Sequence, residues 1–282
     1  MHIIDHVTDR AVEAGGSTAA SHFSGEPPSH DPTSVTEPAA VGVDLGSGYL
    51  KIWASGRPLL HVPTIGDSPT APGRLVRRGR ISDPDGLHAL LARVVARYHP
   101  PLPAGPVVVA CRPVLSGPDG EAAARELLTG AFAPSRLLFI DGVRAAAIGA
   151  GAAPGPLLLA DVGADLVELA VLSGGRVIGA RRADIGMNDL IDPTSHGPIV
   201  RTVADLLAEL RRDPDCRQPA ATALGRGVVL VGGGATQPHL AARISATLGL
   251  AVRTSAIPRV TAVRGAGLAA MAALRRTAMV SA

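Results

Sequence analysis

The sequence predicts an α/β protein with two similar lobes that face a central cleft. Three short apolar segments joined by glycine-containing turns occur twice, and each set is followed by alternating helices and buried strands. The chain has 282 residues and is 46% hydrophobic, which is enough for a sizeable core. It has only three Phe, two Tyr and one Trp, so the core must consist mainly of Val, Leu, Ile and Ala.

Composition excludes several classes of protein. No apolar run approaches the ~18–20 residues that cross a bilayer, and the N-terminus lacks the long apolar segment of a secretory signal. Cys111 and Cys216 cannot make a disulfide framework or a CxxC pair. A net charge of +3 without a cluster of basic residues argues against binding of nucleic acid. We therefore expect a cytoplasmic protein with no transmembrane segment.

The N-terminal half is expected to hold a tail and the first lobe. Residues 1–39 are rich in Ser, Thr, Pro and Gly and lack a sustained hydrophobic period, which predicts a disordered tail. The first lobe is expected at residues 40–153, with Asp83 as the cap of its first helix. Its elements are a three-strand meander at 40–63, a helix at 83–98, a buried strand at 106–111, a helix at 119–132, a buried strand at 135–141 and a small-residue helix at 143–151.

The second lobe is expected at residues 154–282 and repeats the order of the first. Its expected elements are a meander at 155–183, a helix at 198–212, a buried strand at 227–233, a helix at 238–249, a short strand at 250–255 and a last helix at 259–276. The repeated order predicts a duplicated α/β unit.

The first glycine-rich turn follows the first strand and reads VGVDLGSGYLK. Asp44 at the strand end can hold Mg²⁺ through water, and the backbone of Gly46, Ser47 and Gly48 can approach a phosphate. Lys51, the only lysine in the chain, brings a cation to the same place. A plain hairpin turn would have the same residues, so this motif alone leaves both interpretations open.

Two further turns follow strands in the second lobe. The segment LLLADVGADLVELAVL places Asp161 and Gly163 at the matching position of the second meander. The segment VVLVGGGATQPHL leads a strand into Gly232, Gly233 and Gly234 and then into a helix, where glycines permit close approach and a helix N-terminus favours an anion. Three such turns in this order predict a nucleotide site more strongly than any one of them.

The order of DLGSG, FIDGVRAAAIGAG, ADVG and VGGG resembles the actin-like ATPase superfamily, in which these segments are called phosphate 1, connect 1, phosphate 2 and the adenosine motif. AAAIGAG and the segment from VVLVGGGATQPHL onward are similar to the MreB (rod-shape-determining) branch, and the resemblance covers about residues 41–270. It implies the actin-like, ribonuclease H-like fold, with lobes IA and IIA around a nucleotide cleft. It also implies ATP and Mg²⁺ as ligands, with Asp44 and Asp161 holding the metal through waters.

One departure from the MreB pattern concerns length. MreB carries an inserted subdomain in each lobe, IB and IIB. Here about fifteen residues separate His61 from Arg77, where IB should lie, and the stretch from Asp189 to Gly227 has room for one helix and a loop. We therefore expect a chain that lacks both outer subdomains. Because these subdomains supply much of the longitudinal filament contact in the family, self-polymerisation is in doubt.

A second departure concerns the site itself. At phosphate 2 MreB reads DIGGGTTE, whereas this chain reads DVGADLVE from Asp161 to Glu168. Asp165 is expected to face phosphate charge, at a cost on the order of 1–4 kcal/mol for like charges ~4 Å apart, which is roughly a ten- to a few hundred-fold loss of affinity. Glu168 is interpreted as an exposed structural residue. In connect 1 the two glutamates of MreB are replaced by Asp141 and Gly142, and Asp141 remains the candidate to position the attacking water.

The leading interpretation is a truncated MreB-like protein with a partly degenerate ATP site, at most a weak ATPase, that is accessory to cell shape or cell-wall synthesis. Its expected partners are full-length MreB-type filaments or cell-wall synthesis proteins, which would place it at the periphery of the membrane. One alternative is an active, non-polymerising ATPase or small-molecule kinase of the same superfold. Another is an interaction module that docks on such filaments.

Overall fold

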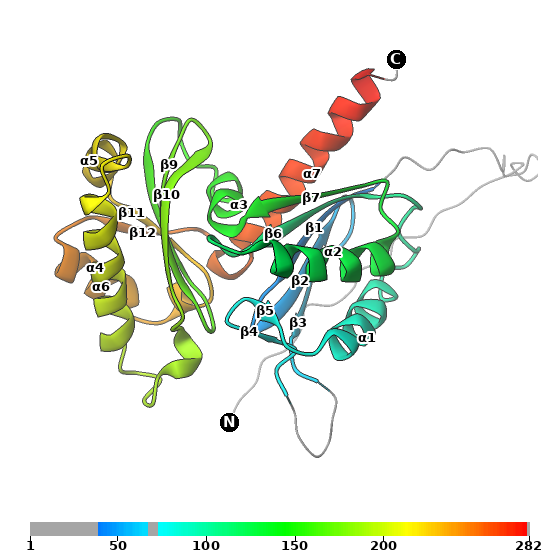
Figure 1. The fold of residues 1–282 in the computed structure, drawn as a ribbon, viewed down its shortest axis with the longest axis horizontal. Coiled ribbons are helices and arrows are strands. Elements are labelled where there is room, and N and C mark those ends of the chain that lie inside the picture. Colours follow the sequence, from blue (N-terminus) through cyan, green and yellow to red (C-terminus); the bar gives the residue numbers. More distant parts are fainter. Residues whose placement is uncertain (1–38, 67–72, 281–282) are drawn as a thin grey trace, which may run out of the picture. The chain divides into compact units, whose positions relative to one another are not determined.

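The computed structural model describes residues 39–66 and 73–280, and the expected tail at residues 1–39 lies almost wholly outside these ranges. Within them the chain forms two five-stranded sheets and a two-stranded hairpin, with helices packed on the sheets (Figure 1). No helix in the described part of the chain is both long enough and apolar enough to cross a membrane.

The first sheet has the strand order β3-β2-β1-β6-β7. Its antiparallel part is the expected meander of β1 (Ala40–Leu45), β2 (Tyr49–Ala54) and β3 (Leu60–Pro63), and its parallel part adds β6 (Val107–Arg112) and β7 (Arg136–Asp141). The apolar runs that open β1 and β6 are fully buried, as strands covered on both faces require. The expected strands of this half are confirmed.

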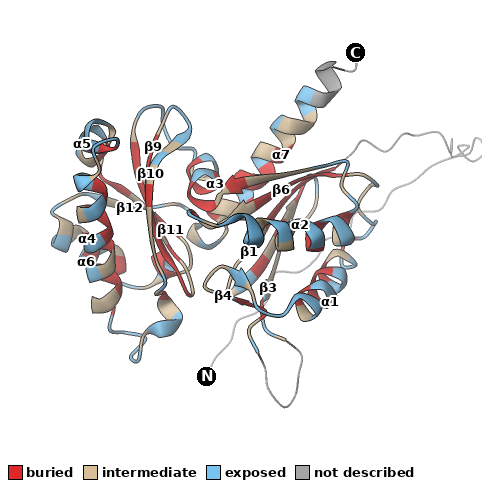
Figure 2. Ribbon diagram, in the orientation of Figure 1, coloured by how far each residue is buried: buried red, intermediate tan, exposed pale blue. Residues whose placement is uncertain are grey.

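The second sheet repeats this topology, with the order β10-β9-β8-β11-β12. β8 (Leu157–Val162), β9 (Val167–Ser173) and β10 (Arg176–Ala183) form an antiparallel meander, and β11 (Val228–Val231) and β12 (Val252–Thr254) continue it in parallel beyond β8. β8 and β9 are buried along almost their whole length (Figure 2). The matching strand orders confirm the duplicated α/β unit.

Amphipathic helices cover one face of each sheet. α1 (Pro84–Val95) and α2 (Pro118–Phe132) share a core with the first sheet, and α4 (Gly197–Arg212) shares one with the second. Asp83 caps α1 as expected, because its carboxylate accepts a hydrogen bond from the Gly86 N–H at 2.9 Å. This bond satisfies one of the free N–H groups of the first helical turn.

The stretch between Asp189 and Gly227 holds more structure than expected. The expectation of one helix and a loop is wrong, because α5 (Arg217–Gly225) follows α4. Ala220 and Ala223 of α5 are buried beside β8. Alanines carry little hydrophobic contrast and α5 has no side-chain cap, so neither periodicity nor a start signal marks this helix. The remaining elements of this half are η1 (Met187–Asp189), η2 (Gly234–Thr236), α6 (Leu240–Leu248) and η3 (Pro258–Val260).

α3 (Gly142–Gly149) and α7 (Thr261–Val280) pack closely against each other beside the first sheet. α7 follows β12 and η3 in the chain, and the sequence-based division places it in the second lobe. In the structure α7 instead contacts β1, β2 and β6 (Figure 1). The two helices can approach this closely because Gly265 of α7 has no Cβ. A Cβ there would overlap the carbonyl oxygen of Ala145 in α3.

A short hairpin of β4 (Val76–Arg77) and β5 (Arg80–Ile81) precedes α1. Nothing in the sequence predicts this hairpin, because two-residue strands are too short to show a hydrophobic period. Arg78 and Gly79 form its turn with φ of 49° and 70°, the left-handed conformation that a two-residue hairpin turn requires. This hairpin lies beside the candidate site.

Candidate functional site

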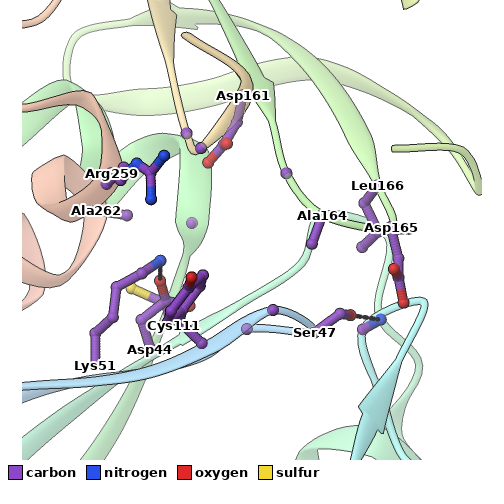
Figure 3. A pocket seen from close by; sticks show the side chains of 18 of the residues that line it. Asp44, Ser47, Lys51, Cys111, Asp161, Ala164, Asp165, Leu166, Arg259 and Ala262 are labelled. Carbon is purple, nitrogen blue, oxygen red and sulfur yellow. Dashed lines mark hydrogen bonds and ion pairs between the residues drawn. The ribbon is translucent and has the colours of Figure 1, made fainter. Parts of the chain in front are cut away.

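A cavity of about 280 Å³ lies between the two halves of the fold, where the three glycine-rich turns meet (Figure 3). The turns follow β1, β8 and β11, so they lie at the carboxyl ends of strands, the usual place for a ligand in an α/β fold. Of the residues expected to bind a nucleotide, the lining includes Asp44, Gly46, Ser47, Gly48, Lys51, Asp161, Gly163, Gly232 and Gly233. The fold therefore brings motifs from both halves of the chain together.

The turns of the two meanders have the same local geometry. Gly46 N donates to the Tyr49 carbonyl at 3.1 Å, and Gly163 N donates to the Leu166 carbonyl at 2.8 Å. The first motif is thus a hairpin turn that also lines the cavity, so its two interpretations are compatible. Gly232 has a φ of +88°, and a Cβ there would overlap the carboxylate of Asp161 in the neighbouring strand.

Lys51 and Asp44 form an ion pair in the lining. Lys51 Nζ lies 2.7 Å from Asp44 Oδ2, and the two side chains are only 16% and 20% exposed. Burial alone would lower the pKa of Lys51, but the Asp44 carboxylate outweighs it and the pKa is raised. Burial raises the pKa of Asp161 to about 6, against the opposing effect of Lys51. Lys51 is therefore a cation throughout the neutral pH range.

Glu168 is buried, and the expectation of an exposed structural residue is wrong. Its residue exposure is 8%, because β9 is covered along almost its whole length. Glu168 Oε1 accepts a hydrogen bond from Val114 N at 2.6 Å, in the loop after β6. Burial, together with the nearby charge of Asp161, raises the pKa of Glu168 to about 8. A carboxyl group of the second half is thus protonated at neutral pH and holds a loop of the first.

Asp165 lines the cavity, but basic and amide groups surround its carboxylate. It accepts from Arg74 Nη1 at 2.6 Å, from Asn188 Nδ2 at 2.8 Å and from Arg78 N at 3.2 Å. Burial would raise the pKa of Asp165, but these hydrogen bonds and the two arginine charges outweigh it and the pKa is lowered. The sequence alone predicts that Asp165 faces a phosphate as an unpaired charge. Because Arg74 offsets this charge, Asp165 would repel a phosphate less than expected.

Arg78 connects the hairpin turn to the second half of the chain. Its guanidinium donates to both carboxylate oxygens of Asp189, at 2.6 and 3.1 Å, and also to the carbonyl of Asp184. The next residue, Gly79, donates its N–H to Ser47 Oγ at 3.3 Å. The hairpin therefore contacts both the phosphate 1 and the phosphate 2 turns.

Replacing Asp165 with alanine should lower the free energy of unfolding by about 2 kcal/mol, because it removes a buried carboxylate that accepts three hydrogen bonds. The value is below that of a fully buried pair because the Arg74 side chain is 39% exposed and water can solvate it. Urea denaturation at pH 7 measures the change. Asp205→Ala, at an exposed position of α4, is the matched control and should change stability by less than about 0.5 kcal/mol. Equal effects would contradict the assigned contacts.

Two of the expected site residues lie outside the lining. The carboxylate of Asp141 pairs with Arg112 Nε at 3.0 Å, and Arg112 also pairs with Glu121 at 2.6 Å. The neighbouring Gly142 does line the cavity but has no side chain to offer. Gly234 is buried, and a Cβ there would overlap the side chain of Val162. The water-positioning role of Asp141 stays a prediction.

Several residues of the lining carry no motif and are missed by sequence reasoning. His61 on β3 contacts the Tyr49 ring at a tilted angle, with ring centroids 4.3 Å apart, and its Nε2 is buried with no hydrogen-bond partner. Arg259 on η3 enters the cavity and donates to Thr236 Oγ1. His61 lines the cavity because it lies opposite Lys51 in the register of β2 and β3. No pattern in the sequence reveals how these two strands align.

Comparison with protein-family models gave no match, and comparison with curated protein sequences gave none. Solved structures are similar. MreB 5 of Spiroplasma citri bound to AMPPNP has a TM-score of 0.74 and 13% identity, over 88% of this chain and 100% of that chain. The ethanolamine utilization protein EutJ of Carboxydothermus hydrogenoformans has a TM-score of 0.57 and 18% identity, over 83% of this chain and 90% of that chain. MamK, solved as a double helical filament, has a TM-score of 0.63 and 16% identity, over 83% of this chain and 99% of that chain.

The chain has the actin-like ATPase fold. This confirms the fold class expected from the four motifs, with the two sheets as its duplicated lobes and the cavity between them. At 13–18% identity the likeness to these structures shows the fold.

Proposed function

We propose that the chain binds an adenine nucleotide in the cavity with weak affinity and little or no hydrolysis. The observation that carries this proposal is the convergence of three glycine-rich turns and Lys51 on one cavity between two actin-like lobes. The similarity to MreB 5, which was solved with AMPPNP, supports a nucleotide as the ligand. The cavity volume of about 280 Å³ is near the lower limit of small-molecule sites, which span ~300–1,000 Å³.

Weak binding and slow hydrolysis follow from the side chains of the lining. The phosphate 2 turn offers Leu166 where a hydroxyl would donate to a phosphate, and its Asp165 adds a negative charge that Arg74 only partly offsets. Asp141, the candidate to position the attacking water, already pairs with Arg112, and Gly142 has no side chain. The fold thus keeps the shape of a nucleotide site while several of its usual polar groups are replaced.

Mg²⁺ is the metal implied by the actin-like fold, and Asp44 and Asp161 are its expected ligands through water. Both carboxylates line the cavity. However, the ammonium group of Lys51 bonds Asp44 at 2.7 Å, so one of the two carboxylates already has a cation. The residues present fit a divalent ion poorly for this reason.

The proposed biological role is that of an accessory protein in cell shape or cell-wall synthesis, a truncated actin-like chain without subdomains IB and IIB. Its proposed partners are MreB-type filaments or cell-wall synthesis proteins at the periphery of the membrane. Similarity to MamK, solved as a double helical filament, supports a filament as the partner. Co-sedimentation with MreB-type filaments tests this role, and co-sedimentation unaffected by Asp161→Ala would instead favour a pure interaction module.

Titration with ATP by calorimetry, in excess Mg²⁺, tests the nucleotide site. We expect a dissociation constant of roughly 10 μM or weaker and no release of phosphate. Nanomolar to low-micromolar affinity with turnover would contradict the degenerate site, and turnover abolished by Asp141→Ala would favour the active ATPase or kinase.

A variant that fills the cavity provides the structural control. Gly233 lines the cavity, and a Cβ there would meet no atom within 4 Å, so Gly233→Val should fold normally and lose ATP binding. Gly225→Val, at the end of α5, also adds a side chain in open space and lies outside the lining. It should bind ATP as the unmodified chain does. Equal affinity of the two variants would exclude this cavity as the site.

A further inference from the structure

We propose that Lys51 acts as the resident cation of the cavity, so that the site binds the phosphates of a nucleotide without a divalent metal ion. This inference rests on the proposed nucleotide site and identifies its cofactor requirement. The sequence predicts Mg²⁺ as the cation of the site, whereas the inference assigns that role to Lys51. Nucleotide binding with and without Mg²⁺ distinguishes these two cations.

The first support is the position of Lys51. It lies directly across from Asp44 in the β1–β2 pair, so the sheet register fixes the two side chains beside each other. Lys51 Nζ lies 2.7 Å from Asp44 Oδ2. Figure 3 shows this ion pair on one side of the cavity and Asp161, from the second lobe, on the other. The ammonium group thus already bonds one of the two oxygens of the Asp44 carboxylate.

The second support is the set of oxygen donors. Mg²⁺ in proteins is held by carboxylates together with ordered waters and substrate phosphates. Here the carboxylate of Asp44 forms an ion pair with Lys51, and the carboxylate of Asp141 forms one with Arg112. Gly142 contributes no side chain. Within the described ranges no group of three His, Cys, Asp or Glu could hold a metal ion. A divalent ion would therefore have to bind Asp161 or the other oxygen of Asp44 beside the Lys51 ammonium group, whose positive charge repels it.

The third support is the hydrogen-bonding capacity of the ammonium group. Lys51 carries three N–H donors, and its bond to Asp44 leaves two for phosphate oxygens. Arg259 brings a second positive charge into the cavity from η3. A lysine is also the more suitable residue for this position, because its charge is a compact point, as a metal ion is, whereas the guanidinium of arginine is a broad plane. The chain has 27 basic residues, and its one lysine lies here.

Binding of ADP with excess Mg²⁺ or with excess EDTA tests the inference by calorimetry on the full chain. We expect the two dissociation constants to agree within about twofold. Lys51→Met should weaken binding in EDTA by tenfold or more and should make binding depend on Mg²⁺, because Asp44 is then available to a metal. Circular dichroism establishes that the variant is folded.

Asp44→Asn distinguishes Lys51 from Mg²⁺ as the cation of the cavity, even if Lys51→Met does not fold. If Lys51 is the cation, this substitution frees the ammonium group for phosphate, and ADP should bind equally well or more tightly in EDTA. If Mg²⁺ is the cation, the substitution removes a ligand and ADP should bind more weakly. Weaker binding by this variant, in either buffer, would overturn the inference.

Mn²⁺ binding, followed by electron paramagnetic resonance without any nucleotide, gives an independent readout. The unmodified chain should leave Mn²⁺ free, and Lys51→Met should bind it. Tight Mn²⁺ binding by the unmodified chain would overturn the inference. ADP binding that requires Mg²⁺ would overturn it too and leave the nucleotide site standing, whereas absence of ADP binding in both buffers would overturn the proposed function and this inference with it.

Discussion

Replacing Gly265 with alanine is expected to lower the free energy of unfolding by about 3 kcal/mol. Gly265 lies in α7, where alanine would otherwise favour the helix by up to ~1 kcal/mol. Its Cβ, however, would overlap the carbonyl oxygen of Ala145 and lie 2.8 Å from the backbone N of Gly149, both in α3. Backbone atoms cannot rotate away as a side chain does, so the two helices must separate. The clash therefore decides the sign of the effect.

Gly120→Ala is the matched control for this prediction. Gly120 also lies inside a helix, α2, but a Cβ there would meet no atom within 4 Å. It should therefore raise stability by roughly 0.5–1 kcal/mol through helix propensity and a less flexible unfolded chain. Urea denaturation followed by circular dichroism compares the two variants. An increase in stability for both would show that α3 and α7 do not pack as closely as described.

Replacing Glu168 with glutamine is expected to stabilise the protein at neutral and alkaline pH. The pKa of Glu168 is raised by burial from 4.5 to about 8 in the folded state. A carboxyl group with a raised pKa contributes stability that is complete below pH 4.5 and is lost as the pH rises to about 8. At about 1.4 kcal/mol per pH unit, the loss over this window is on the order of 5 kcal/mol. Glutamine has no proton to lose, and its oxygen can still accept from Val114 N.

The measurement is the urea midpoint of both proteins between pH 4 and 9. The two curves should coincide near pH 4 and diverge steadily up to about pH 8, with the variant more stable. Glu209→Gln, on the exposed side of α4, is the control and should follow the unmodified chain at every pH. A variant less stable than the unmodified chain at pH 8 would show that the fold stabilises the ionised form of Glu168.

Most of the fold could be predicted from the sequence, because its strands and most of its helices carry strong local signals. Asp44 and Asp161 at the strand ends and most glycines of the three turns line one cavity in the structure, and they could be found because turn chemistry and strand ends are local features. α5 could not be found, because the buried Ala220 and Ala223 give little contrast with their neighbours. Local signals therefore located the backbone of the site.

The charges of the site could not be read from the sequence in the same way. Asp165 looked like an unpaired charge because its partner Arg74 is 91 residues away in the chain. Glu168 is expected to be exposed because it is a charged residue on a meander strand where MreB also has a glutamate, yet both faces of that strand are covered. Both errors concern contacts between the two lobes. Such contacts depend on how the lobes pack, which a reading of each segment by itself does not include.

The position of α7 has a consequence for how the chain folds as it is synthesised. Ala266 and Ala270 of this helix share a core with Ala40, Val109 and Ile140 of the first sheet. The strands of that sheet are translated before α7 (Thr261–Val280), so the side that faces α7 stays uncovered until this helix has been made. Contacts of such large sequence separation slow folding, and exposed apolar surface on a nascent chain favours aggregation. The first sheet is therefore made before the second, but its core is completed only after the second sheet has been made.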